Sequence, residues 1–349
     1  MNLAPPLLAR YAESLFWMAR YLERVENLAR LIEVTYIFES PGRESESWYA
    51  LVRINADEES FSRRHGIADP DAIKRFYLIE TDNPTSIPAA IEVARTNARV
   101  LRPLISTEMW KQLNQFHHAL TAIAPAELEG DALSRLADRI RAGVQAQTGI
   151  TEGTFFRDQS WHFLELGRLI ERADQTTRLL DIKFHLLVPR AREERRLVEL
   201  TQWGSVLRAA AGYHAFRRIA PVEFTPADVV AFLLTDASFP RSVRLCLDEI
   251  ERHLTALRIR YGLGGTRAAL ERAEEIRALI AGAETERLSA GGLHAFLDNL
   301  QHALIGLAGE IGTAFFRDWR PYAPGQEQVG QEQGDREPAR QGQRQEQAG

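Results

Sequence analysis

The segment Arg20-Tyr21-Leu22-Glu23-Arg24-Val25-Glu26-Asn27-Leu28-Ala29-Arg30 returns 148 positions later as Arg168-Leu169-Ile170-Glu171-Arg172-Ala173-Asp174-Gln175-Thr176-Thr177-Arg178. On a helix, the apolar side chains of the first segment form one stripe, and most of its charged side chains fall on the opposite arc. Arg24 is the exception, because it falls on the flank of the apolar stripe. We therefore predict that Arg24 is partly buried and that a carboxylate holds its guanidinium.

The repeat extends over most of the chain, which indicates an internal duplication. Further matches occur at offsets between 148 and 160: Trp48 with Trp203, Asp69-Pro70 with Thr225-Pro226, Pro84-Thr85-Ser86-Ile87 with Pro240-Arg241-Ser242-Val243, and Phe155-Phe156-Arg157-Asp158 with Phe315-Phe316-Arg317-Asp318. The periods of about 20 to 50 residues that are typical of solenoids are absent. We predict that residues 1–158 form the first copy and residues 159–320 the second.

The periodic segments are rich in Ala, Leu, Arg and Glu, and none alternates apolar and polar residues for long enough to form a sheet. Helices are expected over residues 7–38, 47–64 and 131–149, after the N-caps Asp69, Ser106 and Thr225, and after Pro84 and Pro240. The predicted fold is all-α, with about six helices per copy. A short linker favours one pseudo-symmetric bundle over two separate ones. Residues 321–349 lack an apolar face and are predicted to be disordered.

Composition excludes several classes of protein. The chain has 349 residues, 26% of them charged, a net charge of −5 and a pI near 6.0. A nucleic-acid-binding protein would show a basic stripe, so this class is not expected. The single cysteine, Cys246, excludes a disulfide framework and favours the cytosol. We expect neither a signal peptide nor a membrane-spanning helix, because residues 1–8 lack a positive region and no apolar run reaches about 18 residues.

Several of these motifs resemble those of a known family. The segment Ala12-Glu13-Ser14-Leu15-Phe16-Trp17-Met18-Ala19-Arg20-Tyr21-Leu22-Glu23-Arg24 looks like the opening of the alpha-E family, which consists of bacterial all-helical proteins named for a recurrent Glu-Arg motif. The segment from Phe155 to Gln175 resembles the family's central part, and Asn83-Pro84-Thr85-Ser86-Ile87 also fits. The resemblance covers about residues 10–317.

The resemblance implies a role but no reaction. Members of the family tend to be encoded beside, or fused to, circularly permuted ATP-grasp proteins and transglutaminase-like proteins. This association implies a helper in ATP-dependent formation of amide or peptide bonds, or in the handling of the product. The resemblance supplies no catalytic residue and no cofactor.

A cluster of charged residues is the best candidate for a functional site. If the two repeated helices pack about a pseudo-twofold axis, eight charges would meet: Arg20, Glu23, Arg24, Glu26, Arg168, Glu171, Arg172 and Asp174. Such a cluster could bind an anionic or peptide ligand, because arginine offers a two-pronged donor to carboxylate or phosphate. We favour a structural role, with i,i+4 pairs from Glu26 to Arg30 and from Asp174 to Arg178 and with Arg24 and Arg172 anchoring the interface between helices.

Other chemistry finds little support. The Glu-x-x-His pattern of carboxylate-bridged metal sites is missing, and His117 and His118 point about 100° apart on a helix, so we predict no metal. The other histidines, among them His162 and His253, show no ligand spacing. Cys246 lies on an apolar helix face and is expected to be a core residue. Residues 262–265 follow a helix rather than a strand, so their glycines predict a helix stop and not a phosphate loop.

Three hypotheses follow. The first is a non-catalytic helical accessory protein that acts with an ATP-grasp-type ligase, and possibly with a transglutaminase-like protein, through the shared Glu-Arg helix faces and an apolar groove. The second is an enzyme that uses the Glu/Arg cluster on an anionic or peptide substrate. The third is a purely structural scaffold.

Overall fold

The computed structural model describes residues 7–37, 39, 42, 44–186, 202–220, 224–290 and 292–316, and side chains at all of these except 182–186 and 289–290. The predicted disordered segment 321–349 lies outside the described residues. Within the described part there is no strand, so the prediction of an all-α fold is confirmed. None of the described helices combines the length and the apolar character needed to cross a membrane.

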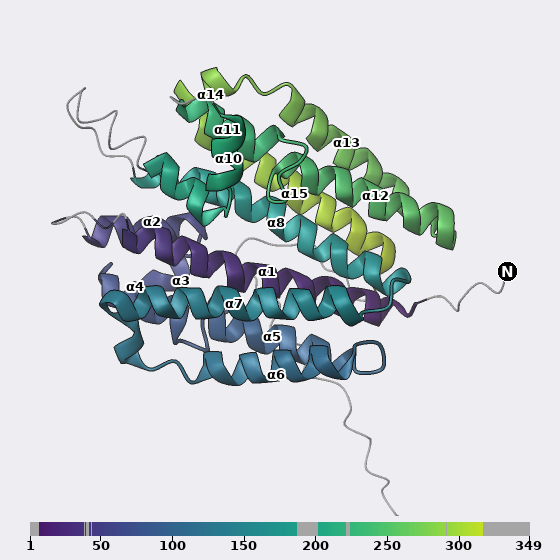
Figure 1. The fold of residues 1–349 in the computed structure, drawn as a ribbon, viewed down its shortest axis with the longest axis horizontal. Helices are drawn as coiled ribbons and strands as arrows, with labels where there is room; N and C mark the ends of the chain where they lie inside the picture. Colours follow the sequence, from purple (N-terminus) through teal and green to yellow (C-terminus); the bar gives the residue numbers. More distant parts are fainter. Residues whose placement is uncertain are drawn as a thin grey trace, which may run out of the picture.

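Two long helices form the centre of the fold: α1 (Ala9–Ile37) and α8 (Gln159–Leu186). They pack along each other (Figure 1), and among the described elements no other pair has a more extensive contact. On the side of α1 lie α5 (Ile87–Val100), α6 (Thr107–Thr121) and α7 (Gly130–Thr154). On the side of α8 lie α12 (Val243–Tyr261), α13 (Arg267–Ala281) and α15 (Leu293–Phe315).

Shorter elements complete the two sides. They are α2 (Glu44–Ile54), α3 (Glu58–Arg64), α4 (Pro70–Leu78), the 3-10 turn η1 (Pro125–Leu128), helical residues 202–209, α10 (Tyr213–Ile219), α11 (Pro226–Thr235), the 3-10 turn η2 (Gly264–Thr266) and α14 (Thr285–Ala290). The buried apolar side chains of both sides form one continuous core, which includes the fully buried rings of Trp48 and Trp203. The division into copies at residue 158 stays a prediction.

Helix starts follow the local sequence closely. The side chains of Asp69, Ser106 and Thr225 each accept a hydrogen bond from the backbone N–H three residues on, which confirms these predicted N-caps. The helices after Pro84 and Pro240 begin three residues beyond each proline. There Ser86 and Ser242, both fully buried, cap α5 and α12 in the same way.

The prediction of a continuous helix over residues 47–64 was wrong. The chain breaks into α2 and α3 at Ala56, whose φ is +56°. The N–H of Asp57 donates to the carbonyl of Val52 at 3.0 Å, which is the six-to-one hydrogen bond of a helix C-terminus. Ala211, with φ +55°, separates residues 202–209 from α10 in the same way. Glycine usually takes this left-handed position, so alanine gave no indication of a break.

The close approach of α1 and α8 depends on Gly167. A Cβ atom at this position would lie 2.2 Å from the backbone oxygen of Phe16 on α1. The backbone of one helix therefore occupies the space that a side chain of the other would need. No other residue type fits here without moving the helices apart.

We expect Gly167→Ala to lower the free energy of unfolding by about 2 kcal/mol or more, because overpacking forces α1 and α8 apart. Gly149→Ala is the matched control, since Gly149 also lies in a helix but has open space around its Cβ position. That change should stabilise the protein by about 0.5–1 kcal/mol. Urea unfolding measures both. Equal effects of the two substitutions would contradict the close contact.

Candidate functional site: the Glu-Arg cluster between α1 and α8

The two Glu-Arg dipeptides of the repeated segments bind each other reciprocally. Arg24 donates to Glu171 with Nε–Oε1 and Nη2–Oε2 distances of 2.7 and 3.1 Å. Arg172 donates to Glu23 with corresponding distances of 2.8 and 2.9 Å. Each glutamate on one helix thus receives a two-pronged hydrogen bond from the arginine on the other. This confirms the prediction that a carboxylate holds Arg24.

Additional arginines saturate the two glutamates. Arg20 donates through Nε to Glu171 Oε2 at 2.7 Å. Arg241, which lies just before α12, donates to Glu23 Oε1 at 2.8 Å and contacts Glu26 Oε1 at 2.9 Å. The sequence analysis missed Arg241, because it lies more than two hundred residues from Glu23 along the chain. Its counterpart in the repeat, Thr85, carries no charge that could have suggested it.

The two predicted i,i+4 pairs are also present. Arg30 contacts Glu26 at 2.5 Å, and Arg178 contacts Asp174 at 2.8 Å. Each arginine also donates to a backbone carbonyl two residues before a left-handed alanine: Arg30 to Ala209 and Arg178 to Ile54, at 2.9 and 2.8 Å. The pairs therefore satisfy carbonyls at helix C-termini that would otherwise lack a donor.

Arg168 departs from the predicted arrangement. Its guanidinium contacts Glu165 of the same helix and lies 3.7 Å from Glu152 of α7. Arg20, its counterpart in the repeat, forms an ion pair with Glu171. In the described part of the structure, no equivalent ion pair joins Arg168 to Glu23. Arg20, Glu23, Arg24, Glu26, Glu171 and Arg172 thus lie in the central network, while Asp174 and Arg168 form pairs beside it.

Burial sets the electrostatics of the central network. The side chains of Glu171 and Glu23 are 0% and 3% exposed. Burial alone would raise the pKa of each carboxyl, but Arg24 and Arg20 hold the pKa of Glu171 well below its ordinary value, and Arg172 and Arg241 do the same for Glu23. Likewise, Glu171 holds the pKa of Arg24 above its ordinary value despite burial. Both glutamates therefore stay ionised near neutral pH and are poor general acids or bases.

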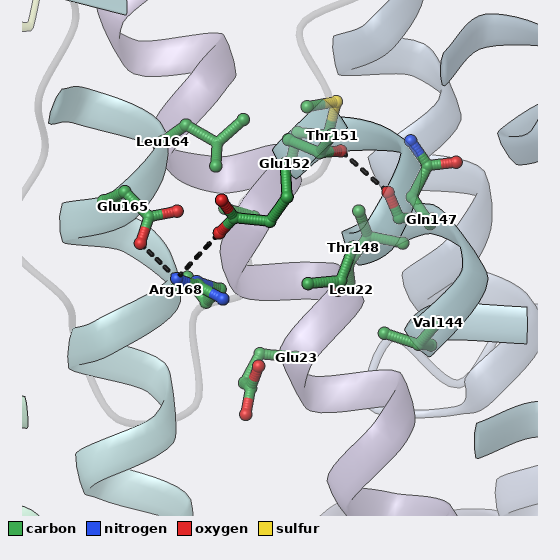
Figure 2. A pocket seen from close by; sticks show the side chains of 12 residues that line it. Leu22, Glu23, Val144, Gln147, Thr148, Thr151, Glu152, Leu164, Glu165 and Arg168 are labelled. Carbon is green, nitrogen blue, oxygen red and sulfur yellow. Dashed lines mark hydrogen bonds and ion pairs between the residues drawn. The ribbon is translucent and has the colours of Figure 1, made fainter. Parts of the chain in front are cut away.

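A small pocket adjoins this network (Figure 2). It lies among α1, α7 and α8, and polar and apolar side chains are mixed around it: Leu164, Glu165 and Arg168 come from α8, Val144, Gln147, Thr148 and Glu152 from α7, and Leu22 and Glu23 from α1. Its free volume is about 30 Å³. One water needs roughly 10–15 Å³, so the pocket has room for two or three waters.

The sequence analysis also missed a buried acid. Asp57 Oδ2 accepts hydrogen bonds from the Tyr77 and Thr85 hydroxyls at 2.7 and 2.8 Å. Burial raises the pKa of Asp57 to about 6, because these two donors and the nearby Arg178 offset the burial only in part. Nothing in the local sequence distinguishes Asp57 from a surface aspartate.

A pair of histidines was missed in the same way. His162 on α8 and His253 on α12 face each other with their Nδ1 atoms 2.8 Å apart, so one ring donates the hydrogen bond that the other accepts. Burial lowers the pKa of both, that of His253 to about 3. They are 91 residues apart, which is why no spacing pattern indicated them.

The remaining sequence predictions can be compared directly with the structure. Cys246 is buried, as predicted, and burial raises its pKa to about 11. Gly262 ends α12 with φ +70°, which confirms the predicted helix stop. His117 pairs with Glu92. Among the described residues, no three His, Cys, Asp or Glu side chains converge to hold a metal ion.

Comparison with known proteins identifies the class. Residues 7–316 match the alpha-E family, described as a predicted alpha-helical domain with a conserved ER motif. The match covers most of the chain, including both Glu-Arg dipeptides of the cluster. The chain therefore belongs to the alpha-E family.

The relatives that match this chain are much longer than it is. The chain is 27% identical over 337 residues to the uncharacterized protein Mb2597 of Mycobacterium bovis and to the uncharacterized protein Rv2567 of Mycobacterium tuberculosis. Each match covers 87% of this chain but only 36% of the relative, so the chain spans about a third of the length of these proteins. No solved structure matches the chain.

We expect Glu171→Gln to lower the free energy of unfolding by about 3 kcal/mol, because it leaves the partly buried Arg20 and Arg24 without their anion. Glu275→Gln is the matched control: its pair with Arg272 is also short, at 2.8 Å, but both side chains are largely exposed. That change should cost under about 1 kcal/mol. Chemical unfolding at constant pH measures both. A small loss for Glu171→Gln would show that water satisfies the two arginines.

We expect Asp57→Asn to change how stability depends on pH. Because the folded pKa of Asp57 is raised to about 6, its contribution is complete below its unfolded pKa of about 4 and is lost as the pH rises through 6. Two pKa units correspond to about 3 kcal/mol. The asparagine oxygen can still accept from Tyr77 and Thr85 but does not titrate. Urea unfolding should therefore show the wild type losing about 3 kcal/mol relative to the variant between pH 4 and 7, and a constant difference would refute this.

Proposed function

We propose that this protein is a non-catalytic helical accessory protein, and that its Glu-Arg cluster holds α1 and α8 together rather than binding a substrate. The observation that supports this most directly is the saturation of the central network. Glu23 and Glu171 are buried, and their oxygens accept hydrogen bonds from arginines of this chain. A ligand would have to displace these contacts before it could bind.

We further infer that the ER motif of the family is this reciprocal pair, Glu23-Arg24 with Glu171-Arg172, produced by duplication of an ancestral half. The matched geometry of the two halves supports the duplication: each contributes one glutamate and one two-pronged arginine. Ala56 and Ala211 supply a second match, because both end a helix in the left-handed conformation. One continuous core across both halves supports a single bundle over separate domains.

The proposed partner is a circularly permuted ATP-grasp-type ligase, and the proposed setting is the cytoplasm. Support for the partner comes from the proteins that are encoded beside, or fused to, members of the alpha-E family. Transglutaminase-like proteins are also among them. The length of the mycobacterial relatives is consistent with it, since nearly two thirds of each lies outside the match. In such proteins this domain works within a longer chain.

Reconstitution tests the proposal. The chain alone should not turn over ATP, whereas adding it to the purified ATP-grasp protein of the same organism should increase ATP-dependent ligation, followed as ADP release. Glu23→Gln and Arg24→Met should lower the melting temperature, because each leaves buried charge unpaired. At a temperature where circular dichroism shows both variants folded, they should still support the ligase.

Two results would reject parts of the proposal. Turnover by the chain alone, lost in a folded Glu23→Gln variant but kept in the exposed control Glu275→Gln, would instead favour an enzyme that uses the cluster. Absence of any effect on the ligase, with both variants altering only the melting temperature, would favour a scaffold.

A further inference from the structure

A pair of histidines joins the start of α8 to the C-terminal half of α12. The Nδ1 atoms of His162 and His253 lie 2.8 Å apart, and their ring centroids lie 5.1 Å apart. The ring of Tyr261, the last residue of α12, packs on His162 with ring centroids 5.7 Å apart. His253 is only 5% exposed. The hydrogen bond of the pair therefore lies within the contact between two helices.

The histidine pair belongs to one half of the chain only. At the offsets of the repeat, Ser14 stands on α1 in the place of His162, and Asn97 stands on α5 in the place of His253. Neither serine nor asparagine titrates near neutral pH. Asn97 donates to the carbonyl of Val93 on its own helix at 3.0 Å. The packing of α5 on α1 thus provides a comparison without histidines in the same molecule.

Protonation changes the hydrogen bonding of the pair. In the neutral pair, one Nδ1 carries a hydrogen and donates it to the lone pair of the other. A first proton can bind the outer nitrogen, Nε2, of the donating ring, and the hydrogen bond survives. A second proton must bind Nδ1 of the accepting ring, so that both facing nitrogens become donors. Two positive rings then face each other without an acceptor, and they must separate.

The surroundings of the pair oppose a positive charge. Burial lowers the pKa of both rings, that of His253 to about 3. Among the described residues, the charged groups that act on the rings come from α8, α12 and the turn before α8: Arg168, Arg252 and Arg260, which oppose a positive ring, and Asp158, which favours one on His162. Three cations against one carboxylate leave the doubly protonated pair without compensation.

We propose that His162 and His253 form an acid-sensitive contact: their hydrogen bond holds the C-terminal half of α12 on α8 at neutral pH, and double protonation releases it. The release is local. Beyond Leu257, residues 258–260 are exposed, so little apolar packing holds the end of α12 once the pair separates. The buried apolar side chains in the first half of α12 keep that half in place. This proposal does not depend on the accessory function.

The release has a defined pH range. Because the pKa of His253 is lower in the fold than its unfolded value of 6.5, its contribution to stability is complete above pH 6.5 and is lost as the pH falls below that value. A folded pKa of about 3 predicts that His253 alone increases the opening equilibrium about twentyfold between pH 7 and pH 5. His162 adds to this in the same direction.

Hydrogen–deuterium exchange of the full chain at pH 7 and pH 5, corrected for intrinsic exchange rates, tests the proposal. At pH 5 the amides of residues 252–261 should lose protection about twentyfold or more, whereas those of α5 should change less than about threefold. The double variant His162→Gln/His253→Gln keeps an amide hydrogen bond but does not titrate, so it should abolish this loss. His302→Gln is the matched control: His302 also lies on a helix, but its side chain is 70% exposed. This variant should respond like the wild type.

Three results would overturn the proposal. They are an equal loss of protection in α5 and α12, which indicates global acid unfolding; a full response in the double variant, which assigns the effect to another group; and no response in the wild type. If the double variant does not fold, NMR of the histidine rings in the wild type decides. Two rings that titrate well below pH 6.5, together with the loss of α12 protection, support the contact, and rings that titrate near 6.5 overturn it.

Discussion

The structure depends on the exchange of two buried Glu-Arg pairs between α1 and α8. Because Arg24 binds Glu171 and Arg172 binds Glu23, the four charges are neutralised only when both helices lie side by side in one register. Sliding one helix by a turn would leave glutamates and arginines buried without partners, at several kcal/mol each. Buried ion pairs add little net stability compared with apolar packing, but they penalise alternative arrangements. We infer that the cluster specifies how the two halves fit together.

The close contact at Gly167 and the charge exchange support each other. With the Phe16 oxygen where a Cβ atom would stand, the helix backbones are near enough for short two-pronged contacts to form across them. The polar arc of α1 is then buried rather than solvated: Glu23, Glu26 and Arg30 are each less than 5% exposed. This explains why α1 is buried around most of its circumference although eight of its 29 residues are charged.

The halves differ where the local chemistry differs. Arg241 takes, beside Glu23, the place that Arg20 holds beside Glu171, whereas its counterpart Thr85 binds Asp57. The pKa of Arg30 shows an effect of Arg241. Burial lowers this pKa most, and the positive charge of Arg241 lowers it further. In the half where Thr85 stands in the place of Arg241, Asp57 adds a carboxyl group close to Arg178. The two halves therefore share a geometry while distributing charge unequally.

Sequence patterns predicted what depends on neighbours along the chain, and failed for what depends on neighbours in space. Helical periodicity, the caps at Asp69 and Thr225 and the i,i+4 pair of Glu26 with Arg30 are local, so they could be predicted. A carboxylate partner for Arg24 could also be predicted, because the repeat contains a second Glu-Arg dipeptide. The histidine pair could not be predicted, since only the packing of α12 on α8 brings His253 to His162, and Arg241 could not, since its partner Glu23 lies on α1. The left-handed Ala56 was missed for a different reason: the hydrogen bonds of the surrounding fold, rather than the preference of alanine, impose its conformation.

A rigid centre with exposed ends would suit the accessory role that we propose. The charged groups of the Glu-Arg cluster are already paired with each other, so they contribute to the fold and offer little to a partner. The exposed groups lie elsewhere, in turns and helix ends such as Phe156 and Ile259, whose positions are fixed by the helices that precede them. A partner that binds at such an end meets a surface already ordered by the bundle and loses less conformational entropy on binding. Because the cluster pairs its own charges at the centre, recognition in the proposed role would fall to the ends of the bundle.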